Sequence, residues 1–172
     1  METRILVVYA SKYGATTEIA EKIGETLRQS GLLVDISPVK GVKDLSPYNA
    51  FIVGSAAYMF RWRVDAVSFL KKKQNLLAEK PTWLFYSGPL GKGDPLQLVK
   101  GQRFPKPLKP VIDRIKPRDI AVFHGSINMK KLNFFERFFF KKTPEMQGDF
   151  RDWNAIIAWA NSISNALKKD TE

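Results

Sequence analysis

Residues 5–17 read Ile-Leu-Val-Val-Tyr-Ala-Ser-Lys-Tyr-Gly-Ala-Thr-Thr and are followed by a helical pattern. The first six residues form a short apolar run, as in a strand buried on both faces of a parallel sheet. After the polar segment, apolar residues recur at Ile19, Ala20, Ile23 and Leu27, which predicts one apolar face on a helix. A helix that follows a buried strand directly points its free N–H groups at the carboxyl edge of the sheet. The stretch therefore predicts a strand, an anion-binding loop and a helix.

The loop 11–17 has a composition that suits a phosphate monoester. Ser11, Thr16 and Thr17 supply hydroxyl groups, and Gly14 permits a positive φ or a close backbone approach. The loop matches neither G-x-x-x-x-G-K-[ST] nor the dinucleotide pattern G-x-G-x-x-G. From spacing alone, a tight turn whose Ser and Thr side chains only cap the helix is an equal alternative.

At these residues the chain resembles the flavodoxin family, whose first loop reads [ST]-x-T-G-x-T and wraps the phosphate of FMN. Ser11, Gly14 and Thr16 match this pattern, whereas Tyr13 stands where the family usually has Thr. One hydroxyl donor is therefore displaced or replaced by a phenol. The resemblance implies that the phosphate of FMN is held by Ser11, Lys12, Tyr13, Gly14, Ala15 and Thr16.

The rest of the chain alternates apolar runs with helical patterns. Four further strands are predicted, at residues 32–36, 50–55, 83–88 and 120–125. Helices are predicted at residues 64–73, 111–115 and from Asp152 onward, with a loop at 56–62 and a mostly irregular segment at 89–110. This alternation predicts an α/β fold, a flavodoxin-like doubly wound five-stranded parallel sheet of order 2-1-3-4-5. We expect one domain, residues 1–172, with an insertion at 126–150 before the last helix.

Two more loops are predicted beside the first, at the switch point between strands 1 and 3. In flavodoxin-like folds these loops enclose the isoalloxazine ring. The resemblance therefore implies ring contacts from Ser55, Ala56, Ala57, Tyr58, Ser87, Gly88, Pro89 and Leu90. Tyr58 is the predicted stacking residue, and the alternative is that Tyr58, Met59 and Phe60 pack on the neighbouring helix.

Few other residues are candidates for chemistry. Arg61 and Arg63 either tune the flavin and hold substrate carboxylates or are simply solvated. His124, the single histidine, is expected to be structural and to lie away from the switch point. The chain has no cysteine, which excludes disulfides and thiolate metal sites. We predict no catalytic side chain and no metal site, because a bound cofactor would carry the redox chemistry.

The insertion combines aromatic and basic residues. Asn133 and Glu136 have the spacing of a capping box, and Phe135, Phe138 and Phe139 share one helical face. Lysines and arginines surround them in the segment 130–142, a pattern typical of a helix that rests on anionic lipid. Two alternatives are that the phenylalanines cover the sheet edge or form a homodimer contact.

The net charge of +11 argues for an anionic partner, such as lipid headgroups or a carboxylate-rich substrate. The alternative is a generally solvated basic surface, which is the usual explanation for a basic domain. No apolar run reaches the roughly 18 residues of a membrane span. We therefore expect a cytoplasmic protein with peripheral contact at the inner face of the membrane. No recognisable DNA- or RNA-reading motif is present, so nucleic acid is not a predicted partner.

The insertion, the pair Asp152-Trp153 and the segment 54–72 make the chain similar to a narrower group, the menaquinone-dependent protoporphyrinogen IX dehydrogenases. These are flavodoxin-fold FMN enzymes that oxidise a tetrapyrrole and pass electrons to quinone. The resemblance implies an FMN-dependent oxidoreductase with tetrapyrrole and quinone substrates. The alternative is a flavodoxin-type electron carrier that docks on a redox protein and has no substrate of its own.

Overall fold

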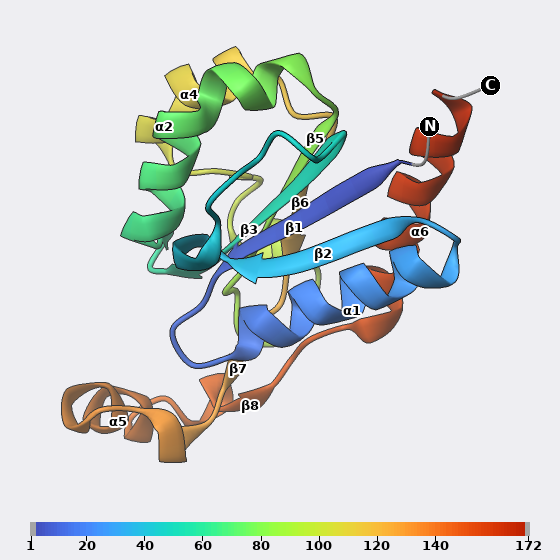
Figure 1. Ribbon diagram of the computed structural model, residues 1–172. Helices are drawn as coiled ribbons and strands as arrows, with labels where there is room; N and C mark the ends of the chain where they lie inside the picture. The colour runs from blue at the N-terminus through green and yellow to red at the C-terminus, as the bar shows by residue number, and fades with distance from the viewer. Residues whose placement is uncertain (1–2, 171–172) are drawn as a thin grey trace.

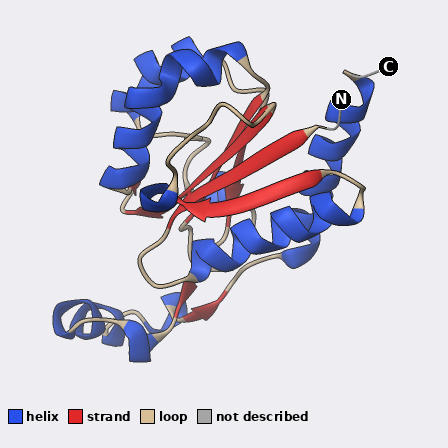
Figure 2. Ribbon diagram, in the orientation of Figure 1, coloured by secondary structure: helices blue, strands red, loops and turns tan. Residues whose placement is uncertain are grey.

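The computed structural model describes residues 3–170, and a parallel sheet lies at its centre (Figures 1 and 2). The five parallel strands within that range follow the order β2-β1-β3-β5-β6, which confirms the predicted order. They are β1 (Arg4–Ala10), β2 (Leu33–Pro38), β3 (Ala50–Tyr58), β5 (Thr82–Ser87) and β6 (Ile120–Phe123). Their apolar runs are buried because helices cover both faces of the sheet.

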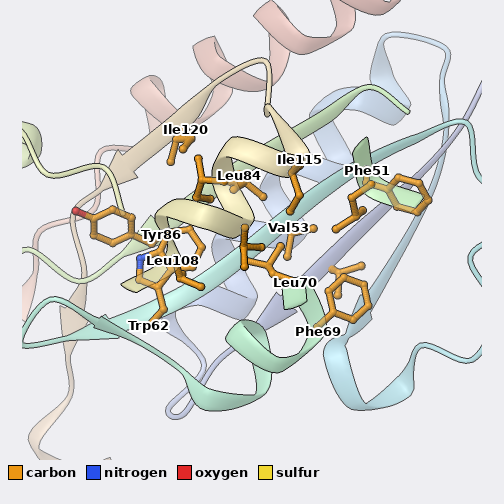
Figure 3. Close-up of a cluster of buried hydrophobic side chains, with 14 of the residues drawn as sticks. Phe51, Val53, Trp62, Phe69, Leu70, Leu84, Tyr86, Leu108, Ile115 and Ile120 are labelled. Carbon is orange, nitrogen blue, oxygen red and sulfur yellow. The ribbon is translucent and has the colours of Figure 1, made fainter. Parts of the chain in front are cut away.

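Within residues 3–170, helices pack against both faces of the sheet (Figure 1). One face carries α1 (Ala15–Gln29) and α6 (Trp153–Lys169), and the other carries α2 (Val64–Glu79) and α4 (Lys109–Ile115). Successive strand residues point to opposite faces, so each strand contributes to two separate cores. In β3, Phe51 and Val53 pack with Leu70 and Ile115 below α2 and α4 (Figure 3), whereas Ile52 packs on the α1 side.

The helix ends follow the predicted signals. The side chain of Asp152 accepts a hydrogen bond from the Ala155 N–H at 3.0 Å and caps α6. Gly31, with φ of 87°, follows the end of α1, where a left-handed residue is needed. The remaining short helices of the core are η1 (Val39–Gly41), α3 (Pro95–Leu98) and η2 (Lys106–Leu108).

The prediction of a loop over residues 56–62 is wrong. Strand β3 continues to Tyr58, turns at Met59 and Phe60, and pairs antiparallel with β4 (Arg61–Trp62). Both turn residues have positive φ, 47° and 62°, as a two-residue hairpin turn requires. Non-glycine residues rarely adopt this conformation, so the sequence carries no usual turn signal here.

The insertion forms a separate arm that projects from the carboxyl end of the sheet (Figure 1). Its base is a two-stranded antiparallel ribbon of β7 (Ser126–Ile127) and β8 (Gly148–Asp149). Between these strands lie η3 (Met129–Lys131), α5 (Phe134–Lys141) and η4 (Pro144–Met146). The predicted capping box is confirmed, because the Asn133 side chain accepts from the Glu136 N–H at 2.9 Å and Glu136 accepts from the Asn133 N–H at 3.1 Å.

Candidate functional site

The first loop lies between the end of β1 at Ala10 and the start of α1 at Ala15. Gly14 is the N-cap residue with φ of 95°, and its N–H donates to Ser11 Oγ at 3.0 Å. Within residues 3–170, no side chain caps the first turn of α1. The free N–H groups and the helix dipole therefore favour an anion at this point.

Hydroxyl groups from the predicted site brace the loops against each other. Thr16 is only 1% exposed, and its Oγ1 lies 2.8 Å from Ser87 Oγ, which joins the first loop to the end of β5. Ser55 Oγ accepts from the Arg63 N–H at 3.0 Å and donates to the Ala56 carbonyl at 2.8 Å. These residues hold the site in shape, and their contact with FMN stays a prediction.

The hairpin of β3 and β4 forms one side of the site. Tyr58 stands at the end of β3, partly exposed, and burial raises the pKa of its phenol, with Tyr13 nearby adding to the shift. Met59 is 90% exposed, so the alternative that it packs on the neighbouring helix is wrong. Phe60 is half exposed beside it. Tyr58 is therefore placed at the carboxyl edge with part of its ring accessible.

The third loop, residues 87–93, is held close to the hairpin. A Cβ on Gly88 would lie 2.4 Å from the Ala57 carbonyl oxygen, so only glycine allows the two segments to approach this closely. Ala56 and Ala57, on the hairpin side of this contact, also have small side chains. Close backbone segments of this kind can present amide groups to the edge of a planar ring.

His124 is buried and hydrogen-bonded, as expected for a structural histidine. Its Nδ1 lies 3.2 Å from the Pro89 carbonyl oxygen and its Nε2 lies 2.8 Å from the Gly93 carbonyl oxygen. It therefore fastens the third loop from the end of β6, which lies away from the switch point between β1 and β3. Its contact with the third loop was not predicted. The strand order contained the signal, because β6 is adjacent to β5 and its end must lie beside the loop that follows β5.

The two arginines of the hairpin region have different environments. Arg63 is paired with Asp65, with Nε 3.1 Å from Oδ1, at the start of α2. Arg61 is exposed on β4. The guanidinium of Arg63 therefore already has a carboxylate partner within the protein. Arg61 is the better placed of the two arginines to bind a carboxylate of a substrate.

The insertion contacts the first loop directly, which sequence reasoning missed. Glu136 of α5 accepts hydrogen bonds from Lys12 Nζ, at 2.5 Å, and from the Tyr13 hydroxyl. Burial opposes ionisation of Glu136, but the hydrogen bonds from Lys12 and Tyr13 outweigh it and lower the pKa of this carboxyl. The same contact with Glu136 raises the pKa of Lys12. The insertion and the loop are therefore joined by a charged cluster.

Two basic residues approach the same loop from distant parts of the chain. Lys131 Nζ donates to the Tyr13 carbonyl at 3.2 Å, and Arg151 Nη1 donates to the Ala15 carbonyl at 3.1 Å. Arg151 is also paired with Glu18 and Asp149. Nothing local in the sequence marks these contacts, because each joins residues more than a hundred positions apart.

A family model described as a flavodoxin domain matches residues 6–154. The chain is 21% identical over 179 residues to protoporphyrinogen IX dehydrogenase [quinone] of Escherichia coli K12, with 98% of each chain covered. It is 29% identical over 99 residues, 45% of this chain and 50% of the relative, to an NAD(P)H dehydrogenase (quinone) of Afipia carboxidovorans. A solved flavodoxin from the domain Archaea superposes with a TM-score of 0.64 at 16% identity, covering 96% of this chain and 99% of that one.

The family match indicates FMN as the cofactor, and the residues present fit it. The uncapped start of α1 and Gly14 suit the phosphate, and Lys131 lies beside them. The accessible ring of Tyr58 and the close backbones around Gly88 suit a planar heteroaromatic ring. The first loop, the hairpin and the third loop thus supply both kinds of surface that FMN needs.

Proposed function

Because this chain belongs to the flavodoxin domain family, we propose that it is an FMN-dependent oxidoreductase that oxidises a tetrapyrrole of the protoporphyrinogen type and reduces a quinone. Bound FMN would supply the redox chemistry. Each removal of two electrons and two protons from the tetrapyrrole is balanced by reduction of one quinone to one quinol. The first loop would hold the phosphate, and Tyr58 with residues 87–90 would orient the ring.

The observation that carries the proposal is the arm at residues 126–149 and its position against the cofactor loop. An electron carrier needs only an exposed cofactor edge, whereas this arm adds an apolar and cationic surface next to the site. Four phenylalanines of α5, Phe134, Phe135, Phe138 and Phe139, are 56% to 81% exposed. The alternative that they cover the sheet edge is therefore wrong.

We place this surface of α5 against anionic lipid, where a quinone would be available. The Nζ of Lys142, the residue after α5, lies 4.5 Å from the centre of the Phe138 ring, so a positive charge is adjacent to the apolar surface of the helix. Aromatic rings enter the interface while cations meet the headgroups. Within residues 3–170 no helix is long and apolar enough to cross a membrane.

The test is turnover by FMN-loaded protein with protoporphyrinogen and a menaquinone analogue, in the presence of vesicles rich in phosphatidylglycerol. We expect oxidation of the tetrapyrrole, and loss of both vesicle binding and most turnover when Phe135, Phe138 and Phe139 are changed to Ser. The control is Leu33→Ser, which removes an exposed apolar side chain on β2. Absence of turnover by the loaded protein would reject the substrate, and self-association lost in the triple variant would instead identify a dimer contact.

The second candidate is an electron carrier that docks on an acidic redox protein, which the net charge of +11 favours. A redox titration that resolves two one-electron steps, together with no tetrapyrrole turnover, would support the carrier. Concerted two-electron reduction together with turnover would support the enzyme.

A further inference from the structure

Lys131 belongs to the arm, yet its ammonium group lies at the mouth of the first loop. Its Nζ is 3.2 Å from the Tyr13 carbonyl oxygen and 3.7 Å from the point that a Cβ on Gly14 would occupy. Gly14 is the N-cap residue of α1, so the ammonium lies beside the free N–H groups of the first helical turn. A cation and helix amides together form a stronger anion site than either alone.

The backbone fixes the place of Lys131. It is the last residue of η3, and its N–H donates to the Asn128 carbonyl at 3.0 Å. The Asn128 side chain caps the same turn through the Lys130 N–H at 3.0 Å. The next residue, Leu132, is buried. Only the side chain of Lys131 is therefore free to adjust, and it extends from a well-anchored point.

The charges around the loop distinguish Lys131 from its neighbour Lys12. Lys12 is neutralised by Glu136, which also accepts the Tyr13 hydroxyl, so that both groups are held toward α5. None of the ion pairs among the described residues includes Lys131. An ammonium group has three donors, and the bond to the Tyr13 carbonyl uses one of them. Two donors and a full positive charge remain at the loop.

We propose that Lys131, supplied by the arm, is the cationic ligand of the cofactor's phosphate, and that Glu136 withholds Lys12 and Tyr13 from this role. The inference depends on FMN as the cofactor and is independent of the tetrapyrrole. A phosphate monoester carries a charge of about −1.5 to −2 at pH 7. The positive charge of Lys131 would attract this group, and its two free N–H donors would form hydrogen bonds to the phosphate oxygens. The arm would then complete the cofactor site in addition to its proposed contact with lipid.

The experiment compares FMN with riboflavin, which has the same ring and no phosphate, by quenching of flavin fluorescence on binding. Lys131→Ala should weaken FMN binding by roughly tenfold or more, the range of a charge-assisted hydrogen bond, and leave riboflavin binding unchanged. Lys131→Arg should retain most of the affinity for FMN. Because neither measurement involves turnover, a failed tetrapyrrole assay does not affect the outcome.

Lys130→Ala is the matched control, because it removes the same charge from the adjacent, exposed position. It should change FMN affinity by less than about twofold, as expected for a screened surface charge. Raising the salt concentration should reduce the difference between wild type and Lys131→Ala. Equal effects of the two alanine variants, or an equal loss for riboflavin and FMN, would overturn the assignment.

Discussion

At the scale of single residues, the site is held together by buried polar contacts that join its loops. Thr16 comes from the first loop and Ser87 from the end of β5, and their hydroxyls bond across 71 positions of sequence. The sequence marked both residues as site residues, but not this contact. The sequence shows that hydroxyl groups in a buried loop need hydrogen-bond partners, but it does not show which residues those partners are.

Thr16→Val should lower the free energy of unfolding by roughly 1 to 3 kcal/mol, because Ser87 loses its partner in a buried place. Thr16→Ser restores the hydroxyl and should recover most of this loss. Urea unfolding of the three proteins measures the effect. A valine variant within about 0.5 kcal/mol of wild type, the usual range for surface substitutions, would show that the contact contributes little.

His124→Leu should weaken FMN and riboflavin by the same factor, because His124 holds the loop predicted to contact the ring and does not lie at the phosphate loop. The variant leaves the Pro89 and Gly93 carbonyls without their partner. Fluorescence titrations with both flavins give the two affinities. A loss confined to FMN would mean that the third loop acts on the phosphate, contrary to our assignment.

At the scale of elements, the sequence predicted the strands and the main helices because each depends on local signals. The apolar runs, Asp152 as N-cap and the capping box of Asn133 and Glu136 all lie within a few residues of the structure that they specify. The hairpin was missed because Met59 and Phe60 lack the Asn-Gly or Gly signal of a tight turn. The third loop also lies against this hairpin at Ala57, and only the assembled sheet brings these two segments together.

The packing beside this hairpin predicts an alkaline transition. Tyr86 is buried against Trp62, and burial raises its pKa to about 12 from the usual 10.0. A raised pKa means that the folded state keeps the proton longer than the unfolded state. The stabilising contribution of the neutral phenol is therefore complete below pH 10 and is lost as the pH rises from 10 to 12.

Tyr86→Phe should remove this pH dependence, at a cost of about 1 kcal/mol near neutral pH for the lost hydrogen bond to the Gln102 carbonyl. Denaturant unfolding of both proteins from pH 8 to pH 12 measures the difference. Wild type should lose stability relative to the variant above pH 10. Parallel curves across this range would show that Tyr86 ionises as freely in the folded protein as in the unfolded one.

At the scale of the whole molecule, the structure consists of an α/β core, which provides the stable packing, and the arm at residues 126–149, which contacts the cofactor loop. Among residues 3–170, the two buried apolar clusters lie in the core, and neither includes a residue of α5. The order of the strands followed from the alternation of strands and helices together with the resemblance to flavodoxins. The contact between arm and cofactor loop did not, because Lys131 is 118 positions from Tyr13 and no sequence pattern joins them.

Replacing residues 128–147 with a two-residue Gly turn between β7 and β8 should leave the core folded. The main losses are the partly exposed ion pair of Lys12 with Glu136 and the burial of Leu132. Together they should lower the free energy of unfolding by no more than about 3 kcal/mol. Circular dichroism and urea unfolding test this, and an unfolded product would show that the arm is part of the core.

The most direct test of the account is the set of backbone amide resonances that shift when 15N-labelled protein is titrated with FMN. We predict shifts in three segments, residues 11–17, 55–62 and 87–93, with Lys131 affected by FMN and not by riboflavin. Shifts confined to other parts of the sheet, or a spectrum unchanged by saturating FMN, would contradict the assigned cofactor site.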